Sequence, residues 1–148
     1  VKRCWIGCSD GTVRAYDVGV KGGRANFKNV YRASLPGSLG HGISTGVSGR
    51  VKEGVVSVGG IEVTNDESTI IVGDSRGKVH FFTSGGEWTG SLEAGEGGGV
   101  RGIEKLKDNG KKGEDNFVVL SGRATYVKVR EDGNFSITKR STDLSGGP

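Results

Sequence analysis

Hydrophobic residues fall in short runs separated by polar, glycine-containing turns, and the clearest example is the stretch Thr69–Thr83. Two apolar runs, 70–72 and 79–82, flank the polar sequence Asp74-Ser75-Arg76-Gly77. β-Branched and aromatic residues suit a half-buried pleated surface, and Gly77 can adopt the positive φ that tight turns require. The pattern predicts a β-hairpin that turns at 74–77.

The same hairpin pattern occurs at two other places in the chain. Arg3–Asp17 predicts a hairpin with its turn at 9–11, and Phe117–Glu131 predicts one with its turn at 121–124. In this alignment Phe81 and Val129 occupy equivalent positions, which we expect to face a neighbouring sheet.

A second repeat places one strand before each of the later hairpins. The triplet Gly60-Ile61-Glu62 recurs 42 positions on as Gly102-Ile103-Glu104. Each full unit then has four strands, in which the first strand precedes the hairpin and the fourth follows it. The predicted first strands are 55–63 and 100–106, and the predicted fourth strands are 27–34, 87–92 and 134–139. We therefore expect eleven antiparallel strands and almost no helix, with the first unit lacking its first strand.

Four short strands per period of about 42 residues match the blade of a WD-repeat propeller. The segment CSDGTVRAYD resembles the end of a WD repeat, with Tyr16-Asp17 where Trp-Asp commonly stands. Phe82-Thr83 and Arg130-Glu131 stand at the corresponding places in the later units. The resemblance implies an all-β fold of antiparallel four-stranded blades, WD40-like or quinoprotein-like, with about three blades in an incomplete ring.

The repeats predict the organisation of the whole chain. We expect one propeller segment over 1–148, divided into a blade part (1–34), a long inter-blade loop (35–54), two blades (55–92 and 100–140) and a tail (141–148). Propellers have at least about four blades, and the chain contains no methionine. We therefore expect either the C-terminal part of a longer propeller or an open stack completed by another subunit.

The loop 35–54 is the main candidate for partner binding. It is rich in glycine and serine and longer than a blade junction requires, and such loops often carry function. Its apolar and basic residues are the expected anchors, and two arginines in hairpin turns are expected on the same face. The candidate partner-binding residues are Ile43, Val47, Arg50, Val51, Lys52, Arg76 and Arg123.

Composition narrows the class of protein and of partner. The chain has 29 glycines and only 32% hydrophobic residues, but the spaced apolar runs favour a turn-rich β domain over a disordered chain. The net charge of +4 is spread over 21 basic and 17 acidic residues, which indicates a solvated surface more than a nucleic-acid footprint. No apolar run is long enough to span a membrane and no signal peptide is evident, so an intracellular location is favoured.

The sequence offers no convincing catalytic, cofactor or metal site. Gly97, Gly99 and Gly102 match the dinucleotide spacing G-x-G-x-x-G, but the short IEKLKDNG that follows does not indicate the required helix. His80, like His41, could join Cys4 and Cys8 in a metal site only if the fold assembled them, and a packed or surface histidine is the simpler interpretation.

Three functional hypotheses follow. The leading one is a non-enzymatic scaffold or subunit that binds protein partners through propeller loops within a multi-subunit complex. The alternative is part of a redox or hydrolytic propeller whose site is completed by blades outside this chain. The third is weak nucleic-acid contact through basic loops, which predicts binding that falls steeply with salt.

Overall fold

The computed structural model describes residues 2–36, 56–95, 98–107 and 113–143, which form eleven strands and no helix. The strands are β1 (Lys2–Gly7), β2 (Thr12–Lys21), β3 (Arg24–Ser34), β4 (Val58–Val63), β5 (Thr69–Asp74), β6 (Lys78–Thr83), β7 (Trp88–Glu93), β8 (Gly102–Lys105), β9 (Glu114–Leu120), β10 (Arg123–Arg130) and β11 (Phe135–Asp143). Within these residues there is no long apolar helix of the kind that crosses a bilayer.

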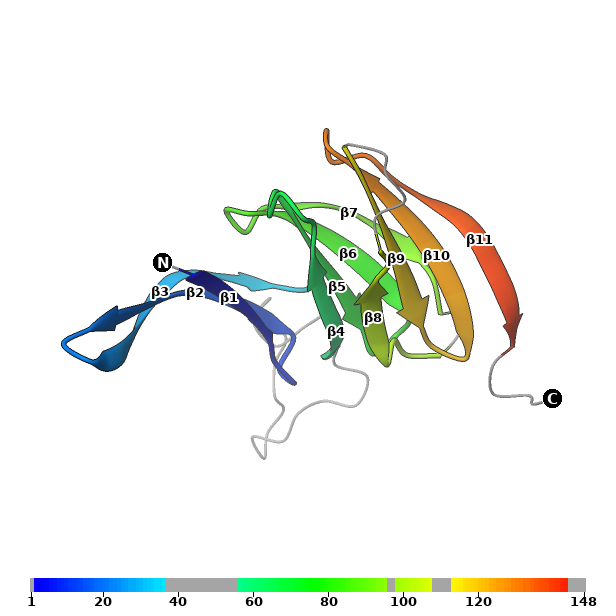
Figure 1. Ribbon diagram of the computed structural model, residues 1–148. Helices are drawn as coiled ribbons and strands as arrows, with labels where there is room; N and C mark the ends of the chain where they lie inside the picture. Colours follow the sequence, from blue (N-terminus) through cyan, green and yellow to red (C-terminus); the bar gives the residue numbers. More distant parts are fainter. Residues whose placement is uncertain (1, 37–55, 96–97, 108–112, 144–148) are drawn as a thin grey trace, which may run out of the picture. The chain divides into compact units, whose positions relative to one another are not determined.

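The strands form three antiparallel sheets, as the repeats predict (Figure 1). One sheet has three strands in the order β1-β2-β3, and the others have four, in the orders β4-β5-β6-β7 and β8-β9-β10-β11. Each sheet is a simple meander because every strand pairs with its neighbour in sequence. Paired strands are connected near each of the predicted turns at 9–11, 74–77 and 121–124, but the third turn is shorter than predicted, since β10 already begins at Arg123.

The chain divides into two compact units, Val1–Val58 and Gly59–Pro148, and each is described by itself. In the first unit, the strands after the hairpin differ from expectation. The stretch 18–26 was expected to connect two strands, but β2 continues to Lys21 and β3 already begins at Arg24. Gly22 and Gly23 have φ values of +62° and +79°, and two positive φ angles make the two-residue turn that joins twisted strands most readily.

The core of the second unit is built from both four-stranded sheets. Its buried residues are Ile71, Val79, Phe81, Ala94, Val100, Ile103, Phe117, Val119, Val127 and Val129. Phe81 of β6 stacks on Phe135 of β11, with ring centroids 3.8 Å apart and planes 6° from parallel. Phe81 and Val129 are both buried in this cluster, which confirms that they face a neighbouring sheet.

The repeated Gly-Ile-Glu triplets lie where the first strands of the two sheets approach each other. A Cβ atom at Gly60 of β4 would lie 3.1 Å from the Cα atom of Gly102 of β8. That distance is tighter than nearly all Cβ contacts in proteins, so glycine at this position permits the close approach. The repeat therefore has a packing reason as well as a place in the pattern.

Truncation of Phe81 tests this core. Phe81→Ala removes a fully buried ring and its stacking contact with Phe135, and it should lower the free energy of unfolding by about 3–5 kcal/mol. Phe27→Ala is the matched control, because Phe27 is 66% exposed and its loss should change stability by no more than about 0.5 kcal/mol. Equal effects of the two substitutions in denaturant unfolding would contradict this assignment of the core.

Candidate functional site

The turn between β5 and β6 is held by the carboxylate of Asp74. Oδ1 of Asp74 accepts hydrogen bonds from the backbone amides of Arg76 (2.8 Å) and Lys78 (3.0 Å). The amide of Gly77 donates to the Asp74 carbonyl, and Gly77 has a φ of +92°. These bonds fix the turn and present the exposed side chain of Arg76 at its tip.

The segment from Ala94 to Arg101 brings the two hairpin turns of the second unit to one edge. The amides of Ala94 and Gly95 donate to the carbonyl of Gly77, and the amide of Val100 donates to the carbonyl of Asp74. The next amide, that of Arg101, donates to the carbonyl of Leu120, which ends β9 beside the other turn. The turns that carry Arg76 and Arg123 therefore lie along the same connecting segment.

This edge carries five basic residues, here called the basic edge. They are Arg76, Lys78, Arg101, Arg123 and Arg140. The Arg140 guanidinium donates to the carbonyl of Glu93 at the end of β7 (3.0 Å), which places the end of β11 at this edge too. Sequence reasoning missed Lys78, which directly follows a predicted turn, as well as Arg101 and Arg140. In a meander of four strands, the chain enters the first strand and leaves the fourth strand at the same edge as the central hairpin turn. The strand order alone would therefore have placed these residues at this edge.

The seven predicted partner-binding residues fall into two groups. Ile43, Val47, Arg50, Val51 and Lys52 lie outside the residues that the structure describes. Arg76 is exposed and Arg123 is half-buried. The structure thus places two of the candidate residues together on the basic edge.

The opposite edge of the second unit is acidic, and it is here called the acidic edge. It comprises the connections β4–β5, β6–β7, β8–β9 and β10–β11, whose described carboxylates are Asp66, Glu67, Glu87, Glu114, Asp115, Glu131 and Asp132. The described cations in the same connections and strand ends are Lys105, Lys107, Lys128 and Arg130, and Lys128 lies 3.6 Å from Glu114. Arg130 lies 3.9 Å from Glu114, and Lys105 donates to the side-chain oxygen of Asn65 (3.1 Å).

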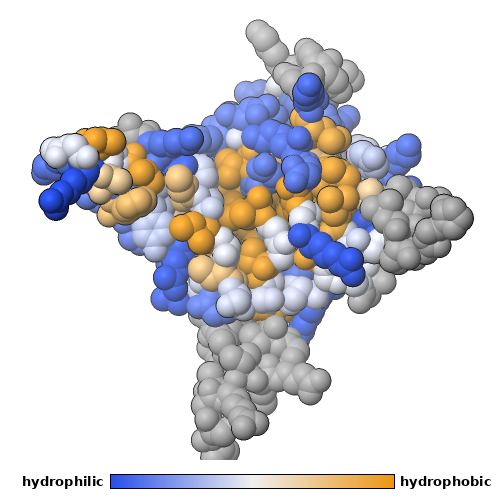
Figure 2. Space-filling model, turned by 60° about the horizontal axis from the view of Figure 1, so that its bottom comes forward, coloured by the Kyte–Doolittle hydropathy of each residue, from blue (hydrophilic) through white to orange (hydrophobic). Residues whose placement is uncertain are grey.

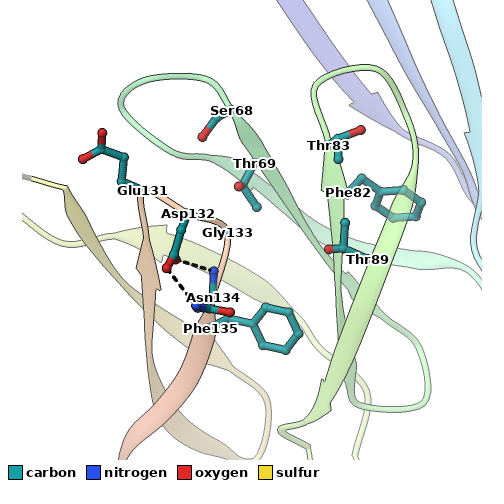
Figure 3. A pocket seen from close by; sticks show the side chains of 10 residues that line it. All are labelled: Ser68, Thr69, Phe82, Thr83, Thr89, Glu131, Asp132, Gly133, Asn134 and Phe135. Atoms are coloured by element: carbon teal, nitrogen blue, oxygen red, sulfur yellow. Dashed lines mark hydrogen bonds between the residues drawn. The ribbon is translucent and has the colours of Figure 1, made fainter.

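A pocket of about 380 Å³ opens on the acidic edge, between the two sheets (Figure 3). One sheet supplies residues from the β4–β5 connection and from β6 and β7, and the other supplies the β10–β11 turn. The lining residues are Ser68, Thr69, Phe82, Thr83, Thr89, Glu131, Asp132, Gly133, Asn134 and Phe135.

The turn that forms one wall of the pocket is internally braced. Asp132 accepts hydrogen bonds from the backbone amide (3.0 Å) and the side-chain amide (2.8 Å) of Asn134. Phe135, the next residue, is held by its stack on Phe81. Glu131 and Asp132 are the charged residues of the lining, which contains no lysine, arginine or histidine. The pocket therefore suits a cationic group with an apolar stem.

A chain of hydrogen bonds runs behind the β5–β6 turn from the exposed Trp88 to the buried His80 and Asp74. The indole N–H of Trp88 donates to Nδ1 of His80 (3.1 Å), so the imidazole proton is on Nε2, which donates to Oδ2 of Asp74 (2.7 Å). His80, one of the two histidines weighed as metal ligands, thus has both ring nitrogens occupied. Burial opposes ionisation of Asp74, but the hydrogen bonds from His80 and from the amides of Lys78 and Arg76 outweigh it and lower the pKa of Asp74 below its ordinary value.

Comparison with solved structures supports the architecture described above. The C-terminal WD40 domain of Sif2 matches with a TM-score of 0.58 at 10% identity, over 93% of this chain and 32% of that one. BBS1N, from its complex with ARL6DN, matches with a TM-score of 0.53 at 14% identity, over 92% of this chain and 37% of that one. No protein-family model and no curated protein matches the sequence.

The chain has the fold of consecutive β-propeller blades. More narrowly, its antiparallel meander sheets are WD40-like, as the sequence resemblance implied. The chain spans about a third of the length of the two propeller structures named here.

The ionised Asp74 should make stability depend on pH in the acid range. Its pKa is lower in the folded state than in the unfolded state, so its contribution is fully present above the unfolded value of about 3.9 and is lost as pH falls through the folded value. Asp74→Asn should therefore flatten, without abolishing, the decline of unfolding free energy between about pH 4 and pH 2. Part of the decline remains because Asp10 and Asp66 also have lowered pKa values. Identical pH profiles for both proteins would contradict this role of Asp74.

Proposed function

We propose that the chain is part of a non-enzymatic propeller scaffold that binds protein partners through the edges of its blades. The observation that carries this proposal is the separation of charge on the second unit. Cations gather on the edge with the hairpin turns, and carboxylates gather on the edge with the pocket. Opposite charges at the two ends of one pair of sheets can orient a partner and accelerate its association.

The pocket gives the proposed interaction its chemistry on the acidic edge. A lysine or arginine of the partner can lay its methylene stem against Phe135 and direct its charged end to Glu131 and Asp132. The hydroxyl groups of Ser68, Thr69, Thr83 and Thr89 make the remaining wall polar. BBS1N, a propeller of similar fold, is described in complex with another protein, ARL6DN, which supports the same kind of role here.

The basic edge favours an acidic protein surface over nucleic acid. It has five cations, but the aromatic residues that stack on bases are absent from its described turns, 74–77 and 121–123, and from 98–101. Its cations are also interrupted by Glu93 and by Asp143, which is paired with Arg123 across the strands. We therefore propose that both edges contact protein, within an assembly of several subunits.

The pocket is tested by photo-crosslinking in an extract of the source cells. A photo-crosslinking amino acid in place of the exposed Ser68 should give discrete protein adducts, identified by mass spectrometry. Glu131→Gln should reduce their yield about tenfold, because a hydrogen bond to a charged group contributes about 1.5–3 kcal/mol.

Glu104→Gln is the matched control for the pocket. It makes the same change of charge on β8, outside the pocket lining, and should leave the adducts unchanged. An equal loss with both variants would mean that only net charge matters. Adducts insensitive to Glu131→Gln would show that the pocket does not bind the partner.

A further inference from the structure

β2 and β3 form a long hairpin in the first unit (Figure 1). The two strands remain paired up to Lys21 and Arg24, which flank the two-residue turn. The part of this hairpin from Asp17 to Lys28 is here called the ribbon.

The ribbon has one apolar and one basic face. Its cross-strand pairs Val18–Phe27 and Val20–Ala25 lie on one face because paired residues point to the same side of a sheet. The apolar face is open to solvent, since Val20 is 80% and Phe27 is 66% exposed, and Figure 2 shows apolar side chains on the ribbon. Exposed apolar side chains gathered on one face indicate a binding surface.

The opposite face of the ribbon carries cations. Lys21 pairs with Arg24 at the tip, and Lys28 follows two pairs further along. Asp17, which is paired with Lys28 across the strands, is the carboxylate on this face, and Arg3 already binds it at 2.8 Å. The face therefore has an excess of positive charge that a partner can complement.

The outer edge of β3 determines what kind of molecule can bind. Within the described residues β3 pairs with β2 alone, so its outer edge presents backbone N–H and C=O groups. A lipid surface supplies no partners for these groups inside its hydrocarbon region, whereas an extended polypeptide pairs with them as an added strand. The edge thus favours a protein segment over a membrane.

The register along β3 determines the sequence pattern of that segment. Side chains of an added strand alternate between the two faces, so those beside Ala25 and Phe27 must be apolar. Those beside Arg24 and Lys28 must be acidic, because like charges placed directly opposite each other destabilise a sheet. The same rule disfavours pairing with a second copy of this ribbon, because the cations Arg24 and Lys28 of one copy would lie opposite the cations of the other.

We propose that the outer edge of β3, from Arg24 to Asn29, binds an extended segment of a partner protein in which apolar and acidic residues alternate. This surface belongs to the first unit, whereas the two charged edges belong to the second. It supplies the proposed scaffold with an additional contact of the strand-addition type.

The probe is a capped peptide, Glu-Val-Glu-Val-Glu-Val-Glu, with a fluorescent label, titrated with the full chain. Its counterpart with lysine in place of every glutamate is the control peptide. We expect the glutamate peptide to bind at least about tenfold more tightly, because it brings opposite charges against Arg24 and Lys28. Two further glutamate peptides are N-methylated at alternate residues, one at the odd and one at the even positions. Only one of these two sets of N–H groups faces the β3 backbone, so one methylated peptide should lose binding and the other should retain it.

Lys28→Glu should reduce binding of the glutamate peptide about tenfold and improve that of the lysine peptide. Lys107→Glu makes the same change of charge at an exposed site of the second unit and should leave both affinities unchanged. Phe27→Ser should weaken both peptides, and because Phe27 is exposed it should preserve the free energy of unfolding. If Lys28→Glu impairs folding, Lys28→Gln should still narrow the difference between the two peptides.

Three results would overturn the proposal. The first is equal affinity for the two peptides, and the second is indifference of both affinities to the Lys28 variants. The third is binding to vesicles of phosphatidylcholine with a fifth of phosphatidylserine in the absence of peptide binding, which would assign the ribbon to a membrane surface. Since none of these experiments involves Glu131 or the pocket, they can fail or succeed independently of the proposed function.

Discussion

The hydrogen bonds of Asp74 hold together the parts on which the second unit depends. Its carboxylate accepts from His80 and from two amides of the turn, and its carbonyl accepts from Gly77 and Val100. A buried carboxylate requires this many donors, because an ionised group without them would be strongly destabilising. One residue therefore links the hairpin turn and strand β6 through its side chain, and the segment that leads into the next sheet through its backbone carbonyl.

The same linkage explains how a chain with scattered charges acquires two edges of opposite sign. Because each sheet is a simple meander, alternate connections lie at opposite ends of the strands. Among the described residues, cations are in excess at one end and carboxylates at the other. Charges of both signs that are nearly balanced along the sequence are therefore partly separated between the two ends of the sheets. This distribution and the ribbon of the first unit are the surfaces that we propose for binding partners.

Much of the fold could be predicted from the sequence because strands and turns are encoded locally. The repeat of Gly60-Ile61-Glu62 and the glycine-containing turns gave the eleven strands and their pairing. The ribbon was missed because Val18 and Val20 alternate with Asp17, Gly19 and Lys21, a weak signal beside the stronger runs, although Gly22-Gly23 marked its turn. The pocket depends on which loops of two sheets come together, and hydrogen bonds such as that from Trp88 to His80 depend on side-chain geometry, so local patterns do not reveal them.

Hydrogen exchange of individual amides in Asp74→Ala tests most directly whether this carboxylate positions the edge. The amides of Arg76 and Lys78 donate to the side chain that is removed, whereas that of Val100 donates to the backbone carbonyl, which is retained. If the carboxylate holds the turn against the connecting segment, all three amides should lose protection together. Continued protection of the Val100 amide, with loss at the other two, would show that the segment is positioned independently of the Asp74 side chain.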